Sequence, residues 1–111
     1  MSLPDRSPIH STLSDHPDMI ELVEEFVAAL EERVASIQTS LETSDLPRLI
    51  HLAHQLKGAS GGYGFAPLGE AAACLEAAAE AAQAVAEVTD EVNELISLCR
   101  RATSAPVRSN R

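Results

Sequence analysis

The residues best suited to chemistry lie in one short segment, residues 53–65, which has the sequence AHQLKGASGGYGF. It contains a histidine, a lysine three positions later and a glycine directly after the lysine: His54, Lys57 and Gly58. Histidine changes its charge near neutral pH, so a neutral imidazole is available there as a nucleophile. The lysine ammonium can neutralise negative charge on a group attached to that imidazole. The segment therefore indicates a nucleophilic histidine with a positive charge beside it.

A helix would place these residues on one face. At about 100° per residue, positions three, four and seven apart share a face, so His54 would lie beside Lys57, Gly58 and Gly61. His54 is also about 120° from the centre of the predicted inner face, which puts its imidazole at the edge of the core with an exposed tip. A glycine inside a helix costs about 1 kcal/mol relative to alanine. Two glycines beside an exposed histidine therefore predict a bare surface that another protein's backbone can approach.

Four stretches with apolar residues at helical spacing must position this segment. The first is expected to begin after an N-cap at Ser14 or Asp15, with Pro17 in its first turn, and to end at Thr43 and Ser44. Its apolar residues step by three and four positions. These residues are Val23, Phe26, Val27, Leu30, Val34, Ile37 and Leu41.

The second stretch carries His54. It is expected to begin with Ser44 as its cap and Pro47 in its first turn, and to stop at Gly64. Its predicted inner residues again follow helical spacing. They are Leu46, Leu49, Ile50, Ala53, Leu56 and Ser60.

The third stretch is expected to begin at Pro67 and the fourth to end at Ala105-Pro106, with a turn near Gln83–Glu87 between them. A single helix of that combined length would leave its apolar stripe without a partner. Four such segments joined by short connections predict an all-α fold, an antiparallel four-helix bundle. We expect the bundle to span residues 14–105. A short N-terminal extension, residues 1–13, is expected to form a flexible arm, and residues 106–111 are expected to form a C-terminal tail.

The composition excludes several classes of partner. With 8 basic and 17 acidic residues, a formal net charge of −9, the chain is expected to bind neither nucleic acid nor an anionic membrane. The aromatic content of 3% favours closely packed helices over a β-sandwich. Residues 1–8 lack the basic flank and apolar run of a secretory signal, and the two cysteines do not form a disulfide framework. We therefore expect a cytoplasmic protein, and the acidic faces favour a monomer.

The second stretch is the one non-acidic part of the predicted bundle. The residues from 45 to 65 have a net charge of +1, whereas the stretches 14–44 and 66–97 each have a net charge of −7. A negatively charged group, or a partner with an acidic pocket, is therefore favoured on the second stretch. The candidate docking residues there are Arg48, His51, Gln55, Gly58 and Gly61.

The segment around His54 resembles the histidine phosphotransfer (HPt) domain. The signature of that family is a helix-borne His-x-x-Lys-Gly, followed by small residues and by a Gly ten positions beyond the His. The matching residues are His54, Lys57, Gly58 and Gly64, with Ala59 and Ser60 as the small residues. The resemblance covers most of residues 17–103.

The resemblance implies a role for a residue on the next helix. In the family, a Gln or Glu 22 positions after the His hydrogen-bonds the imidazole, and Glu76 occupies that position here. If Glu76 accepts a hydrogen bond from Nδ1–H of His54, the lone pair of Nε2 points outward. His54 is then expected to accept a phosphoryl group from a receiver-domain aspartate or a sensor kinase and to pass it to another receiver, with Lys57 neutralising charge.

The expected partners are response-regulator receiver domains, a hybrid sensor kinase, or both. The chain contains neither a G-x-x-x-x-G-K-[ST] loop nor a glycine-rich nucleotide lid, so we expect no autonomous kinase activity. No cofactor is expected on this chain, because Mg²⁺ in such transfers is expected only on the partner receiver domain.

Two alternatives come from other classes of protein. A metal site could use His51, His54 and Glu76, although His51 is expected to project away from the inner stripe and di-metal bundles use Glu-x-x-His pairs that point inward. A helical adaptor could keep the fold and bind partners independently of phosphorylation. The histidine beside Lys57 and Gly58 argues against an adaptor.

Overall fold

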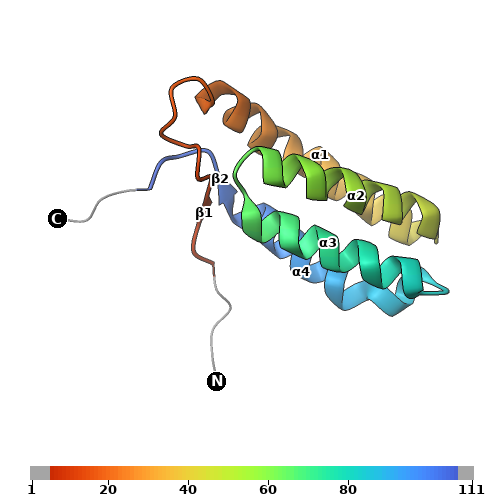
Figure 1. Ribbon diagram of the computed structural model, residues 1–111. Coiled ribbons are helices and arrows are strands. Elements are labelled where there is room, and N and C mark those ends of the chain that lie inside the picture. The colour runs from red at the N-terminus through yellow and green to blue at the C-terminus, as the bar shows by residue number, and fades with distance from the viewer. Residues whose placement is uncertain (1–5, 108–111) are drawn as a thin grey trace.

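The computed structural model describes residues 6–107, and this part of the chain forms four α-helices whose successive members run in opposite directions (Figure 1). The helices are α1 (Ile20–Glu42), α2 (Leu46–Gly62), α3 (Ala66–Ala81) and α4 (Thr89–Arg101). A short 3₁₀ helix (Val85–Val88) precedes α4, and two two-residue strands complete the fold, β1 (Ile9–His10) and β2 (Ala102–Thr103). The predicted all-α four-helix bundle is confirmed. None of these helices is long and apolar enough to cross a membrane.

The core lies along the inner stripe of each helix, where apolar residues repeat every three or four positions. From α2 and α3 the stripe includes three fully buried alanines, Ala53, Ala72 and Ala79, whose small side chains let the two helices pack closely. Gly69 of α3 also lies against α2, since a side-chain carbon added there would be 3.6 Å from the carbonyl oxygen of Lys57. The larger core residues include Val23, Phe26, Leu30, Val34, Ile37, Leu49, Leu56, Leu68, Leu75, Val92 and Leu95.

The connection between α2 and α3 is short and fixed by aromatic packing. The Phe26 ring of α1 stacks against the rings of Tyr63 and Phe65, at centroid distances of 5.2 and 5.4 Å. Gly64 has a φ of +82°, a conformation that favours glycine. The prediction that α2 stops near Gly64 is confirmed, and the turn holds α2 and α3 side by side (Figure 1).

The starts of the first two helices differ from the prediction. Asp45 rather than Ser44 caps α2, because its Oδ1 accepts a hydrogen bond from the backbone N–H of Arg48 at 3.1 Å. The regular helix α1 begins at Ile20 and not directly after Ser14 or Asp15. Residues 17–19 instead form a turn, in which the backbone N–H of Met19 donates to the carbonyl oxygen of His16 at 2.9 Å.

The turn predicted near Gln83–Glu87 is confirmed. The Glu87 carboxylate closes it by accepting hydrogen bonds from the backbone N–H groups of Gln83 and Ala84, each at 2.9 Å. The last helix ends at Arg101, earlier than the predicted end at Ala105-Pro106, because the next residues form β2.

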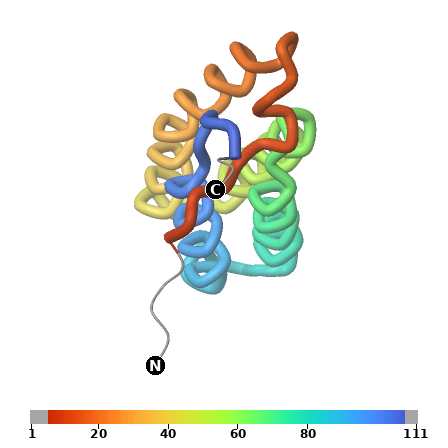
Figure 2. Tube along the Cα trace, turned by 90° about the vertical axis from the view of Figure 1, so that its left-hand side faces the viewer, coloured from red at the N-terminus to blue at the C-terminus, as the bar shows by residue number. Residues whose placement is uncertain are grey.

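The segment predicted as a flexible arm over residues 1–13 packs against the bundle in its described part, residues 6–13. β1 pairs in parallel with β2, with Ile9 opposite Ala102, and the Ile9 side chain is buried. The red N-terminal segment and the blue C-terminal segment therefore lie together at one end of the bundle (Figure 2). The two strands lie at opposite ends of the chain, so no local sequence pattern predicts that they pair. Residues 1–5 of the arm and 108–111 of the tail lie outside the described residues.

The same N-terminal segment holds the α2–α3 turn. Ser11 is buried, and its hydroxyl donates a hydrogen bond of 2.6 Å to the carbonyl oxygen of Tyr63. The backbone N–H of Thr12 donates to the carbonyl oxygen of Gly64 at 3.0 Å. We call residues 7–14 the N-terminal strap, because they join the end of α4 to the α2–α3 turn.

Candidate functional site

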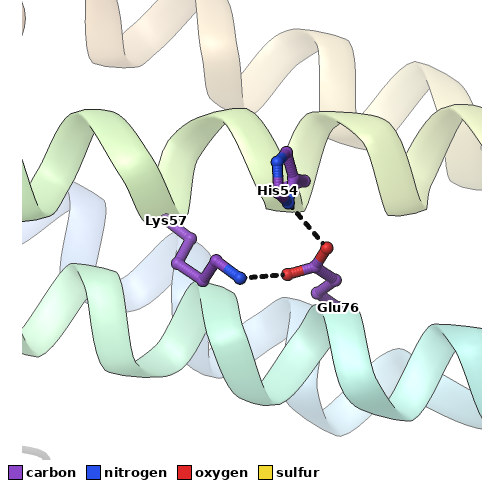
Figure 3. A network of polar contacts seen from close by, with 3 residues as sticks. All are labelled: His54, Lys57 and Glu76. Atoms are coloured by element: carbon purple, nitrogen blue, oxygen red, sulfur yellow. Dashed lines mark hydrogen bonds and ion pairs between the residues drawn. The ribbon is translucent and has the colours of Figure 1, made fainter.

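Three side chains from α2 and α3 meet on the outer face between these helices (Figure 3). His54 of α2 lies with its Nδ1 2.8 Å from Oε2 of Glu76 on α3. Lys57, one turn further along α2, places its Nζ 2.8 Å from Oε1 of the same carboxylate. One glutamate therefore contacts both the histidine and the lysine, each through a different oxygen.

The antiparallel hairpin explains why these residues meet. His54 and Glu76 each lie eleven residues from Phe65, the buried residue in the α2–α3 connection. In two antiparallel helices joined at that point, equal distances from the turn bring residues to the same height. Gly61 and Gly69 satisfy the same relation, and the backbone N of Gly61 lies 3.7 Å from where a side chain on Gly69 would begin.

The three side chains differ in exposure. The side chain of His54 is 63% exposed and that of Lys57 is 41% exposed, whereas that of Glu76 is only 15% exposed. The carboxylate therefore lies beneath the two basic groups, and the imidazole is open to solvent.

The charge of Glu76 follows from its neighbours. The hydrogen bond from Lys57 is the largest cause that lowers the pKa of the Glu76 carboxyl, with a further contribution from His54, while burial acts in the opposite direction. The pKa lies below its usual value of 4.5, so the carboxylate is ionised at neutral pH. An ionised carboxylate only accepts hydrogen bonds, so Nδ1 of His54 must carry the proton. In the neutral imidazole, Nε2 then keeps the lone pair.

The predicted bare surface is present next to this site. Gly58 and Gly61 are exposed, and a side-chain carbon added at either would meet no atom within 4 Å. Packing within the described chain therefore does not require glycine at these positions. A glycine in a helix interior costs about 1 kcal/mol relative to alanine. The stability of the fold therefore does not explain why glycine occupies these two positions.

The remaining predicted docking residues lie on α2 but outside the group of three. Arg48, His51 and Gln55 are exposed, and Arg48 contributes its backbone N–H to the helix cap. His51 makes no polar contact with His54 or Glu76. Within residues 6–107, no group of three or more His, Cys, Asp or Glu side chains is placed to hold a metal ion.

Sequence reasoning missed one contact of this site. It predicted that Lys57 neutralises the charge of a group attached to His54, whereas in the structure the Lys57 ammonium forms an ion pair with Glu76. The signal was present, since a lysine one turn beyond His54 on α2 is within reach of a carboxylate that contacts His54.

A comparison with protein-family models gives one decisive result. The model of the Hpt domain matches residues 21–104. This chain belongs to the Hpt domain family. The match extends from the second residue of α1 to beyond the end of α4, and it does not include the N-terminal strap. Searches of curated proteins and of solved structures gave no significant match.

Membership of the family gives the general role of the protein. The Hpt domain supports a phosphotransfer role in two-component signalling. It also implies interaction with receiver domains or kinases of phosphorelays. The Hpt domain formed here carries its histidine, lysine and glutamate together on the α2–α3 face.

Proposed function

We propose that this protein is a phosphorelay intermediate in which His54 is the phosphoacceptor. His54 would take a phosphoryl group from the aspartate of a receiver domain, or from a sensor kinase, and pass it to the aspartate of another receiver. The observation that carries the proposal is the exposed imidazole whose Nδ1 lies 2.8 Å from the ionised Glu76.

The chemical step follows from the tautomer of His54. The lone pair of Nε2 attacks the phosphorus of an aspartyl phosphate, the new N–P bond forms, and the bond from phosphorus to the aspartate oxygen breaks. The aspartate leaves as a carboxylate, and the positive charge that develops on the ring is stabilised by Glu76 through the Nδ1 proton. Attack by a second receiver's aspartate on the phosphohistidine reverses these bond changes.

Lys57 and Glu76 have separate proposed roles. Glu76 holds the ring orientation and the proton on Nδ1. Lys57 holds Glu76 through the ion pair and adds positive charge beside the phosphoryl group. Positioning and charge neutralisation supply most of the catalysis in phosphoryl transfer, so these two residues would affect rate more than fold.

The receiver is proposed to dock over α2, where the bare glycines allow close approach to His54. Gly58 and Gly61 would lie under the partner's backbone, with Gln55 beside them. Arg48 and His51 extend the same helix toward its N-terminus and would contact the edge of an acidic partner. The proposal needs no cofactor on this chain, and it places the protein in the cytoplasm with its receivers.

The test is phosphotransfer from a phosphorylated receiver domain, with each receiver of the source genome assayed in turn. Wild-type protein should acquire an acid-labile, alkali-stable phosphate, and His54→Gln should acquire none. His16→Gln is the matched control, because it removes an exposed histidine that precedes α1 and lies outside the proposed docking surface, and it should be labelled normally. Labelling of His54→Gln would refute the assignment. Receiver binding without any transfer would favour the adaptor instead.

A further inference from the structure

A groove on the α3–α4 side of the bundle is not used by the proposed phosphotransfer. Its volume is about 640 Å³. Its apolar lining comes from Pro67, Ala71 and Cys74 of α3 and from Leu98 of α4. Both helices also contribute acidic residues to its lining, and no basic side chain lines it. The acidic residues are Glu70, Asp90, Glu91 and Glu94. We call this surface the α3–α4 groove.

The carboxylates of the α3–α4 groove are not compensated by the rest of the described chain. None of the four forms an ion pair or a side-chain hydrogen bond with another residue in the range 6–107. Asp90 and Glu91 lie in the first turn of α4, where the helix dipole favours negative charge. Glu70 and Glu94 lie beyond the first turns of their helices, so the dipole does not account for them. The four carboxylates carry charge of the same sign, so a cation bound in the groove would reduce the repulsion among them.

The α3–α4 groove faces away from the phosphotransfer site. Cys74 and Glu76 are two residues apart on α3, so their side chains leave the helix about 200° apart. Glu76 contacts His54 on α2, whereas Cys74 lines the groove against α4. A molecule bound in the groove would therefore leave His54 exposed.

We propose that the α3–α4 groove binds an amphipathic helix of another protein that carries Lys or Arg beside its apolar stripe. Apolar side chains spaced by three and four positions would pack against the apolar residues of the groove, and the neighbouring cations would reach the carboxylates of both helices. A second copy of this chain is disfavoured as the occupant, because its net charge of −9 would be repelled. Such binding would hold a partner on the domain while His54 stays available, and it does not depend on phosphorylation of His54.

The first experiment measures binding of a synthetic helical peptide of about four turns with leucines on one face and lysines on both flanks. The exposed thiol of Cys74 reports occupancy of the groove through its rate of reaction with a disulfide reagent. Burial raises the pKa of Cys99 to about 11, so that thiol remains protonated and unreactive at about pH 8. Saturating peptide should slow the reaction of Cys74 about tenfold. A peptide with glutamate in place of every lysine should neither bind nor protect.

The second experiment separates the groove from general attraction to an acidic protein. Glu70→Gln combined with Glu94→Gln should weaken peptide binding about five- to tenfold. Glu24→Gln combined with Glu25→Gln makes the same change in net charge at exposed positions on α1 and should weaken it less than about twofold. Equal losses in the two double variants would overturn the proposal, and so would an unprotected Cys74 or equal binding of the acidic peptide.

Discussion

Lys57 and Glu76 form an ion pair across the α2–α3 face, with Nζ 2.8 Å from Oε1. The other oxygen of Glu76 contacts Nδ1 of His54 at the same distance. The lysine is thus linked to the histidine through the glutamate, and not only through proximity on α2. Glu76 is therefore the central residue of the site, because the position and charge of its carboxylate depend on both His54 and Lys57.

Replacing Lys57 by methionine should raise the pKa of the Glu76 carboxyl toward 4.5. The hydrogen bond from Lys57 is the largest cause of the lowered pKa, so its loss should have a greater effect than His54→Gln. A carbon NMR titration of the Glu76 carboxyl measures both variants. Arg48→Met is the control, because it removes an exposed cation of α2 that does not contact Glu76. An unchanged titration in Lys57→Met would show that the ion pair does not form in solution.

The lowered pKa of Glu76 also predicts how stability depends on pH. A carboxyl whose folded pKa lies below its unfolded value stabilises the fold above the unfolded value, here near 4.5, and this contribution is lost as the pH falls through the folded pKa. Wild type should therefore exceed Glu76→Gln in stability at neutral pH, and the two should converge in acid. Urea unfolding at a series of pH values measures the difference. The prediction would be contradicted if the difference in unfolding free energy between wild type and Glu76→Gln stayed constant as the pH fell below the folded pKa of Glu76.

The glycine beside His54 should be replaceable without loss of stability. A side-chain carbon at Gly58 meets no atom within 4 Å, and alanine is the better helix former by about 1 kcal/mol. Gly58→Ala should therefore stabilise the fold by up to about 1 kcal/mol, measured by thermal or urea unfolding. Gly58→Phe should leave the fold intact but slow transfer to His54, because its ring would occupy the surface proposed for the receiver. Equal transfer rates in wild type and Gly58→Phe would exclude docking there.

The sequence predicted the bundle because its core residues repeat at the helical spacing, and burial of Val23, Leu56 and Leu75 follows directly from that repeat. The turn before α4 was placed correctly even though no glycine or proline marks it. The Glu87 carboxylate supplies the missing signal by binding two backbone N–H groups. A glutamate that binds backbone N–H groups three and four residues upstream is hard to distinguish from any exposed helical glutamate.

The parts that were missed depend on contacts between distant segments. β1 and β2 are two residues each and lie at opposite ends of the chain, so neither has a recognisable strand pattern. The Lys57–Glu76 ion pair joins two helices, and helical spacing describes only one helix at a time. The contact between His54 and Glu76 was predicted from the family resemblance, whereas local spacing placed only His54 and Lys57 together.

The N-terminal strap should stabilise the α2–α3 turn through Ser11. Its buried hydroxyl donates to the carbonyl oxygen of Tyr63 at 2.6 Å and accepts from the backbone N–H of Leu13 at 2.9 Å. Ser11→Ala leaves both backbone groups without this partner and should cost about 1–3 kcal/mol, measured as a lower urea midpoint with an unchanged slope. Thr12→Ala alters an exposed neighbour and should change stability by less than about 0.5 kcal/mol.

Gly64 provides the reciprocal test of the strap. A side-chain carbon there would lie 2.6 Å from the Ser11 hydroxyl oxygen, and the residue has a φ of +82°. Gly64→Ala should therefore destabilise the fold by about 1–3 kcal/mol through backbone strain and displacement of the strap. Part of that cost comes from displacing the Ser11 hydroxyl. The combined variant with Ser11→Ala should therefore lose less stability than the two single losses added together. Strict additivity would mean that the strap and the turn are not in contact in solution.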